Sequence, residues 1–269
     1  METFNISTQN CSNIFYRKAG KGHPVVLLHG FPENGGLWSK VMPGLAETFT
    51  VIVPDLPGAG ESSLPTGTTT MEALAEAVAA VLQHEAIEHA VVAGHSMGGY
   101  TALAFAEKYP EQLKGLSLIH SAATPDTEEK KQTRRKSIEL IRKGGKEPFV
   151  KGMTPNLFAE RFNDRHGDVI AQQIERGMQL SGDSMIAFYN AMINRPDRVS
   201  ILSEATFPVQ WIMGKEDSVV PLQSALRQSC LANIDFVSLY NEVGHMSMLE
   251  QPEKLLCDLR EFIAYCYNH

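Results

Sequence analysis

Short apolar runs recur along the chain, and segments with helical spacing separate most of them. Such runs are typical of strands that are buried on both faces of a parallel sheet. They cover residues 25–28, 51–53, 91–94, 116–119, 209–213 and 236–239. Strands that alternate with helices pair in parallel through right-handed crossovers, so the pattern predicts an α/β sheet with helices on both faces.

Weaker patterns complete the predicted sheet and its helices. Residues 3–8 and 12–18 alternate loosely between apolar and polar positions, which predicts a hairpin of two edge strands. Apolar residues at helical spacing, with Thr70 as the N-cap, predict a helix over residues 71–84. Further helices are predicted over residues 37–46, 97–108 and 222–231. A terminal helix is predicted after the loop that ends at residue 252, and it runs to about residue 265.

The alternation of strands and helices is interrupted between residues 124 and 204. This stretch has helical and loop patterns, no convincing buried strand, and many methionine and aromatic residues. We interpret residues 124–204 as a helical cap inserted after the sixth strand, over the carboxyl edge of a core formed by residues 1–123 and 205–269. Most of its large apolar residues then form the core of the cap, and two or three face a substrate pocket.

Composition and charge exclude several classes of protein. Hydrophobic residues make up 43% and charged residues 20% of the 269 positions, which is ordinary for a globular enzyme and not for a disordered chain. The net charge of −7 leaves no basic surplus for nucleic acid. The basic cluster within residues 130–136 stands beside acidic residues, and we interpret it as a solvated helix face. No window is long and apolar enough to predict a membrane span.

The cysteines and the first residues bear on the cellular location. The four cysteines, at positions 11, 230, 257 and 266, lack the spacing of a metal site or a disulfide framework. The first residues have neither the basic start nor the apolar core of a secretory signal. We therefore expect a cytoplasmic protein that binds no metal.

The strongest chemical signal follows the apolar run at residues 91–94. Gly94, Ser96 and Gly98 form a Gly-x-Ser-x-Gly pattern between a predicted buried strand and a predicted helix. A serine at the tip of such a turn has a strained backbone, and a Cβ two residues away on either side would clash. The alternative is a glycine-rich connector with an incidental serine. The strand-to-helix setting favours a nucleophile at Ser96.

A serine nucleophile needs a base within hydrogen-bond reach and an acid that orients the base. His245 follows the last predicted strand in a glycine-containing turn, and Asp217 follows the preceding strand. The order Ser96, Asp217, His245 is the order expected for a nucleophile elbow on such a sheet. These three residues are therefore the predicted catalytic triad.

Other acids and histidines are weaker candidates for these roles. Asp126 lies several residues past the end of its strand, and Glu216 adjoins the favoured acid. Asp55 precedes a Pro-Gly-Ala-Gly turn, and we expect its carboxylate to cap backbone donors there. His95 adjoins the predicted nucleophile, and we expect it to give a supporting hydrogen bond rather than to act as the base.

The attack of a serine on a carbonyl creates an oxyanion, which two preorganised N–H groups can stabilise. One predicted donor is Met97, the residue after the nucleophile. The second is expected in the turn after residues 25–28, where the sequence His-Gly-Phe-Pro favours Phe31. The glycine permits close backbone approach, and Pro32 has no N–H to compete. An ordinary turn at the end of a strand is the alternative.

The four motifs His-Gly-Phe-Pro, Asp-Leu-Pro-Gly-Ala-Gly-Glu-Ser, Gly-His-Ser-Met-Gly-Gly and Val-Gly-His together resemble the α/β-hydrolase fold superfamily. The resemblance covers nearly the whole chain apart from the cap. It implies a mostly parallel eight-stranded sheet, no cofactor, and acyl-enzyme chemistry at Ser96. The segment His-Gly-Phe-Pro-Glu also resembles epoxide hydrolases and haloalkane dehalogenases of this superfamily. Those enzymes use an aspartate nucleophile, so the serine at position 96 favours an acyl-enzyme over an alkyl-enzyme.

The sequence thus favours a serine hydrolase whose partner is a small or medium carboxylic ester. Lactones, thioesters and activated carbon–carbon bonds are weaker candidates for the substrate. The runner-up among enzymes is an acyltransferase or perhydrolase, which would use the same residues but transfer the acyl group to a nucleophile other than water. A receptor of the same fold, which binds a ligand without turnover, is the alternative outside the enzymes.

Overall fold

The computed structural model describes residues 1–269, and its central feature is one sheet with the strand order β1-β2-β4-β3-β5-β6-β7-β8. The strands β1 and β2 form an antiparallel hairpin, β2 pairs antiparallel with β4, and all other pairs are parallel. The predicted eight-stranded, mostly parallel sheet is confirmed. The strands are β1 (Glu2–Ile6), β2 (Ile14–Ala19), β3 (Pro24–Leu28), β4 (Thr50–Pro54), β5 (Ala90–His95), β6 (Leu113–Ile119), β7 (Val209–Gly214) and β8 (Asp235–Tyr240).

The apolar runs form strands because the sheet is covered on both faces. Along β3, Val25 and Leu27 lie in one hydrophobic core, whereas Val26 and Leu28 lie in the other. Successive side chains of a strand point to opposite faces, so every residue of such a run is buried. One face is covered by η1 (Gly35–Lys40), α1 (Met42–Leu45), α11 (Ser247–Glu250) and α12 (Pro252–Asn268). The other is covered mainly by α2 (Met71–His84), α3 (Met97–Lys108) and α10 (Leu222–Leu226).

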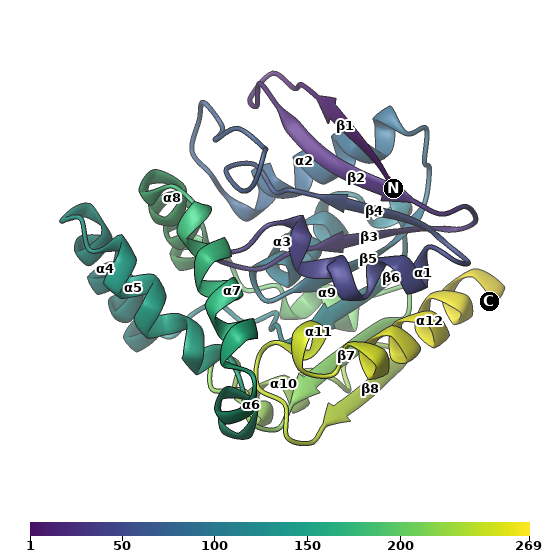
Figure 1. The fold of residues 1–269 in the computed structure, drawn as a ribbon. Helices are drawn as coiled ribbons and strands as arrows, with labels where there is room; N and C mark the ends of the chain where they lie inside the picture. Colours follow the sequence, from purple (N-terminus) through teal and green to yellow (C-terminus); the bar gives the residue numbers. More distant parts are fainter.

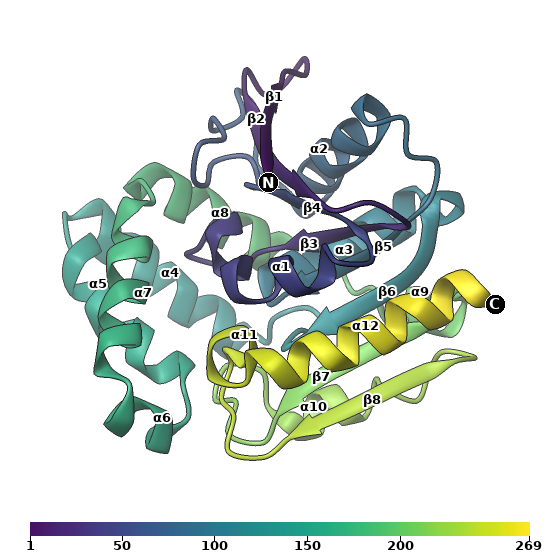
Figure 2. The same cartoon turned by 45° about the vertical axis from the view of Figure 1, so that its right-hand side comes forward.

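The chain between β6 and β7 is entirely helical or irregular, as the sequence predicts. In Figures 1 and 2, its first five α-helices lie together at one end of the sheet, whereas α9 lies beside the core. The predicted division into a core and a separate cap domain at residues 124–204 stays a prediction. The inserted helices are α4 (Glu128–Arg142), α5 (Lys146–Met153), η3 (Thr154–Leu157), α6 (Glu160–Arg165), α7 (Gly167–Gln179), α8 (Gly182–Asn194) and α9 (Val199–Ser203).

Two predicted helices are wrong in extent. The segment 37–46 is a 3₁₀ helix followed by the short α1, because Pro43 has no N–H and cannot continue a helix from the preceding turn. The predicted helix 222–231 ends at Leu226, and Gln228 turns inward to accept a hydrogen bond from Ala123 N at 2.7 Å. No helix has the length and apolar character needed to cross a lipid bilayer.

The sheet brings several loops to one edge. The strand β3 lies between β4 and β5, so the direction of winding reverses there, and ligands of open α/β sheets bind at such a point. The ends of the parallel strands are in register: Leu28 is opposite Gly94, and His95 is opposite Ile119. The loops after β3, β5, β6, β7 and β8 therefore start side by side.

Candidate functional site

Ser96 lies in the tight turn between β5 and α3, with a φ of 51° and a ψ of −112°. This backbone conformation is strained for a residue with a Cβ. Hydrogen bonds hold it in place: the Ser96 N–H donates to Ile119 O at 2.9 Å, and its carbonyl accepts from Ser121 Oγ at 2.8 Å. Every other residue between positions 90 and 106 is buried, whereas Ser96 is partly exposed. The predicted nucleophile is thus accessible on a fixed backbone.

The glycines around Ser96 are required by close packing. A Cβ at Gly94 would lie 2.2 Å from the carbonyl oxygen of Gly98, and a Cβ at Gly98 would lie 2.5 Å from that of Leu28. The turn after β3 also passes close to the serine, because a Cβ at Gly30 would lie 2.7 Å from His95 Nδ1 and 3.2 Å from Ser96 Cβ. Only glycine fits at these three positions, as the sequence pattern predicts for the two that flank the serine.

His245 and Asp217 lie next to each other after β8 and β7. His245 Nδ1 is 2.8 Å from Asp217 Oδ2, and both side chains are buried. An ionised carboxylate only accepts hydrogen bonds, so Nδ1 carries the proton and Nε2 is left as an acceptor. Burial lowers the pKa of His245 below its ordinary value, although the charge of Asp217 acts in the opposite direction. The imidazole is therefore neutral at pH 7 and can take up a proton.

His95 links the serine turn to the loop of His245. His95 Nε2 is 2.9 Å from the carbonyl oxygen of His245, and the centres of the two rings are 4.9 Å apart. This is the supporting hydrogen bond that the sequence predicts for His95. No hydrogen bond joins Ser96 Oγ to His245. Such contacts are often long in a substrate-free enzyme and shorten when the substrate binds.

Asp217 is held by four N–H donors. Its Oδ1 accepts from the backbone N–H groups of Val219 and Val220, at 2.8 and 2.9 Å. Its Oδ2 faces His245 and also His120 Nδ1, which is 3.2 Å away. Burial raises the pKa of Asp217, but the two imidazoles outweigh burial and hold this pKa well below its usual range. The sequence reasoning missed His120, although a polar residue directly after an apolar strand was the available signal.

The loop of His245 is fixed by Glu250 and by the inserted helices. Glu250 Oε1 accepts from the N–H groups of the residues on both sides of His245, at 3.1 and 3.0 Å. Glu250 Oε2 accepts from Ala159 N at 2.9 Å, and the His245 N–H donates to Leu157 O at 2.7 Å. The position of the imidazole is therefore coupled to the segment between η3 and α6. No local pattern of residues predicts this coupling.

The two predicted oxyanion donors lie at the turns next to Ser96. Met97 begins α3, and the first N–H groups of a helix have no partner within it. Phe31 follows Gly30 in the turn after β3, and its N–H takes part in no hydrogen bond of the structure. Both N–H groups are thus free to bind an anion.

A buried polar cluster behind the serine turn was not predicted. Glu33 Oε2 lies 3.4 Å from His95 Nδ1, and Gln173 Nε2 of α7 donates to Glu33 Oε1 at 3.1 Å. Burial raises the pKa of the Glu33 carboxyl, but the neighbouring His95 outweighs it, so the pKa lies below its ordinary value. The cluster connects the turn after β3, the residue before Ser96 and the inserted helix α7.

The competing acids have other partners. Asp126 is paired with Arg134 at 2.6 Å and with Arg195 at 3.1 Å, and these arginines hold the pKa of its buried carboxyl below the usual range. Glu216 is exposed. Asp55 accepts the backbone N–H of Glu61, just after the Pro-Gly-Ala-Gly turn, at 3.0 Å, as the sequence predicts, and also that of Gly35 at 2.7 Å. Of the acids considered, only Asp217 contacts His245.

One trio of residues near the serine is close enough to hold a metal ion. His120, Asp217 and His245 each offer a ligand atom, and these atoms lie within 4.8 Å of one another. Both imidazole Nδ1 atoms already face Asp217 Oδ2. Binding of a metal here would take His245 Nδ1 away from the carboxylate that orients it.

A cavity of about 660 Å³ adjoins the loops that carry these residues. Tyr100 of α3, Ala122 after β6 and Val219 after β7 line it from the core, and Lys130 and Arg195 line it from the inserted segment. Its volume falls within the range of small-molecule sites, about 300–1,000 Å³.

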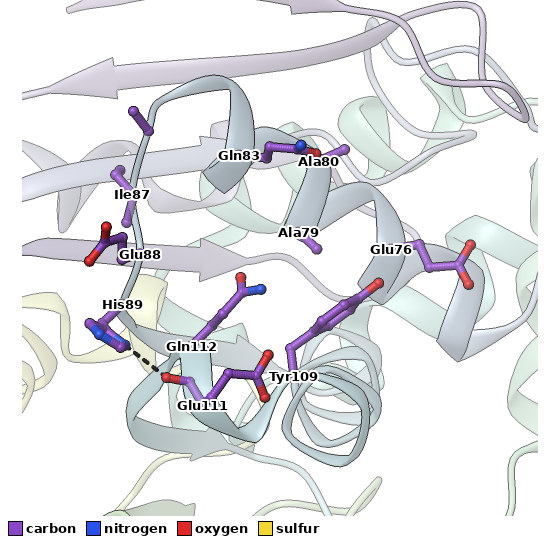
Figure 3. A pocket seen from close by; sticks show the side chains of 11 residues that line it. Glu76, Ala79, Ala80, Gln83, Ile87, Glu88, His89, Tyr109, Glu111 and Gln112 are labelled. Atoms are coloured by element: carbon purple, nitrogen blue, oxygen red, sulfur yellow. Dashed lines mark hydrogen bonds between the residues drawn. The ribbon is translucent and has the colours of Figure 1, made fainter.

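A second cavity, of about 790 Å³, lies beside the start of β5, and Figure 3 shows the residues that line it. It is lined by α2, by the residues leading into β5 and by η2 (Pro110–Gln112). Its only histidine, His89, is hydrogen-bonded through Nδ1 to Glu111 O at 2.7 Å. No serine, cysteine or threonine is among the residues that line this cavity.

Comparison with known proteins extends these observations. The α/β-hydrolase fold family matches residues 23–252. A thermophilic esterase from Thermogutta terrifontis, solved with malate bound, is 32% identical, with a TM-score of 0.92 over 99% of both chains. A pimeloyl-[acyl-carrier protein] methyl ester esterase from Pseudoalteromonas atlantica is 29% identical over 91% of this chain and 96% of that protein.

A soluble epoxide hydrolase from Corynebacterium sp. is 41% identical, but over only 36% of this chain and 34% of that protein. The family match spans far more than half of the sequence, and the structure of the Thermogutta terrifontis esterase agrees with the observed fold over nearly the whole chain. The chain belongs to the α/β-hydrolase fold family, whose members among these relatives are hydrolases.

Proposed function

We propose that the protein is a serine esterase that hydrolyses small or medium carboxylic esters through an acyl-enzyme. The observation that carries this proposal is the serine at the strained turn beside a buried, hydrogen-bonded His245–Asp217 pair. Two of the similar proteins are esterases by name, which supports the same reaction class. The epoxide hydrolase is similar over a shorter region, and the aspartate chemistry expected of that class does not fit a serine at position 96.

In the proposed reaction, Ser96 Oγ attacks the ester carbonyl carbon while His245 Nε2 takes the hydroxyl proton. The new carbon–oxygen bond gives a tetrahedral oxyanion, which the N–H groups of Phe31 and Met97 stabilise. The bond to the alcohol oxygen then breaks, and His245 returns the proton to the leaving alcohol. Water attacks the acyl-enzyme with the same base, which releases the acid and restores the serine. Asp217 keeps His245 in the required tautomer throughout.

The surroundings of Phe31 suggest where the acyl group lies. The ring of Phe31 contacts that of Tyr189 in α8, with 4.6 Å between centres, and lies 6.3 Å from that of Phe149 in α5. These three aromatic rings offer an apolar environment to a group bound next to the proposed oxyanion donors. We therefore expect short aliphatic or aromatic acyl esters to be better substrates than long-chain lipids.

A panel of chromogenic esters of increasing acyl length, assayed with wild type and Ser96→Ala, tests the proposal. We expect the substitution to lower kcat by about 10⁵–10⁶-fold, as in other serine triads, without loss of folding. Equal turnover by both proteins would contradict it. Added alcohol or peroxide in the same assay separates hydrolysis from acyl transfer by the products. A ligand that raises Tm without any turnover would favour a receptor instead.

A further inference from the structure

Asp217 has a second imidazole partner besides His245. His120 Nδ1 lies 3.2 Å from the same Oδ2 atom that His245 Nδ1 approaches to 2.8 Å. The centres of the two rings are 5.6 Å apart. Two N–H donors that converge on one oxygen restrict its position more tightly than one does.

The position of His120 has a structural cost. Its φ of 49° lies in the left-handed region, which few residues with a side chain adopt and in which asparagine, aspartate and histidine are the most frequent of these. Its side chain is completely buried, and its Nε2 has no hydrogen-bond partner. The backbone N–H donates to Ile212 O at 2.8 Å, which fixes this strained residue between β6 and β7. A buried polar ring with one unpaired nitrogen is disfavoured unless its other contacts compensate.

The protonation state of His120 follows from its surroundings. Three titratable groups face it: Asp217 after β7, His245 after β8 and His95 at the end of β5. Burial lowers the pKa of His120 to about 4, against the opposite effect of Asp217. The ring is therefore neutral at pH 7. Since Nδ1 faces a carboxylate, the proton is on Nδ1, and Nε2 is the unpaired acceptor.

We propose that His120 is a positioning residue whose Nδ1–H donates to Asp217 Oδ2 and holds this oxygen in line with His245. The role rests on the proposed function, because it supports the base of that reaction. His120 does not touch the reacting atoms and acts only through Asp217. The proposed site is then a line of four residues, in the order Ser96, His245, Asp217 and His120. His120 ends this line as a neutral hydrogen-bond donor to Asp217.

A matched pair of variants tests the role of His120. In His120→Asn, the amide nitrogen takes the place of Nδ1, and asparagine tolerates the left-handed backbone. His120→Leu has nearly the same shape as asparagine but no donor. We expect the leucine variant to lose about 10–100-fold in kcat with a KM within about 3-fold of wild type. We expect the asparagine variant to keep most of the wild-type activity.

The pH profile separates positioning from general destabilisation. Without the His120 donor, the charge of Asp217 acts more fully on His245, so the acid limb of kcat/KM moves upward by about half a pH unit in the leucine variant. The asparagine variant keeps the wild-type limb. Wild-type kinetics in His120→Leu would overturn the proposal, and so would equal losses in both variants. If His120→Leu does not fold, His120→Met, which also lacks a donor, replaces it, and equal activity of the asparagine and methionine variants would then contradict the proposal.

An NMR measurement distinguishes failure of this proposal from failure of the proposed function. The downfield ¹H resonance of the hydrogen-bonded Nδ1 proton of His245 is followed in ¹⁵N-histidine-labelled protein, which requires no turnover. We expect this resonance in the wild type and in His120→Asn, and a shifted or broadened one in His120→Leu. Identical spectra of the wild type and His120→Leu would overturn the role of His120 even in an active esterase. An inactive wild type that shows the predicted spectra would contradict only the proposed function.

Discussion

At the scale of single residues, the site depends on which carboxylate orients the base. Asp217 and Asp126 are both buried at the carboxyl edge of the sheet, and both have pKa values held below the usual range. They differ in their partners, because Asp217 faces two imidazoles and Asp126 faces two arginines. The first arrangement can support proton transfer. The second joins the inserted segment to the loop after β6.

The variants Asp217→Asn and Asp126→Asn separate the two roles. In Asp217→Asn, an amide replaces the acceptor of the His245 proton, and we expect kcat to fall by about 10³–10⁴-fold. In Asp126→Asn, two buried arginines lose their counter-charge, so stability should fall by about 3 kcal/mol while kcat of the folded protein stays near wild type. Ester hydrolysis and urea unfolding check both variants, and the reverse pattern would contradict the assignment of Asp217.

At the scale of elements, a helix of the core fixes a loop and a segment of the insertion together. Glu250 in α11 accepts N–H groups on both sides of His245 and also that of Ala159 before α6. Burial raises the pKa of the Glu250 carboxyl in spite of these donors. Movement of the inserted helices is thereby linked to the position of the imidazole.

Substitution of Glu250 by glutamine tests this link. The amide can accept through only one atom, so at least one buried N–H loses its acceptor, at a cost of about 1–3 kcal/mol. We expect lower stability and about a 10-fold lower kcat, because the His245 loop is no longer held on both sides. Glu253→Gln, on the exposed first turn of α12, is the matched control and should resemble the wild type. Equal kcat in Glu250→Gln and this control would contradict the coupling.

At the scale of the whole molecule, burial of neutral histidines around the site makes the fold sensitive to pH. Burial lowers the pKa values of His29, His120 and His245 in the folded protein. In the unfolded chain each would titrate near pH 6.5. Below that pH the unfolded state binds more protons, so the free energy of unfolding decreases as the pH falls. Glu250, with its raised pKa, acts in the opposite direction as a single group.

Urea unfolding between pH 7.5 and pH 5 measures this effect. We expect stability to be nearly constant above about pH 7 and to fall below pH 6.5, by up to about 1.4 kcal/mol per pH unit for each buried histidine. Carboxylates with lowered pKa values add their losses only at lower pH, near the unfolded values of about 4. A constant free energy of unfolding down to pH 5.5 would show that these histidines are protonated in the folded protein.

Local patterns predicted much of the fold and the main site residues. The strands were recognisable because their residues alternate between two cores, and Ser96 because the glycines that its turn requires stand two positions away on either side of it. Contacts between distant segments left no such pattern. The Glu33–Gln173 pair joins residues 140 positions apart, and Glu250 meets Ala159 across 91 positions. The early end of α10 likewise depends on Gln228 turning toward Ala123, which no spacing rule describes.

The most direct test of the central claim is a crystal structure of the protein after reaction with a serine-reactive phosphonate. The account predicts a single adduct on Ser96 Oγ, with the phosphonyl oxygen about 2.7–3.1 Å from the N–H nitrogens of both Phe31 and Met97. It also predicts that His245 Nε2 faces Ser96 Oγ while Nδ1 remains on Asp217. An adduct on another residue, or an imidazole out of hydrogen-bond reach of the modified serine, would contradict it.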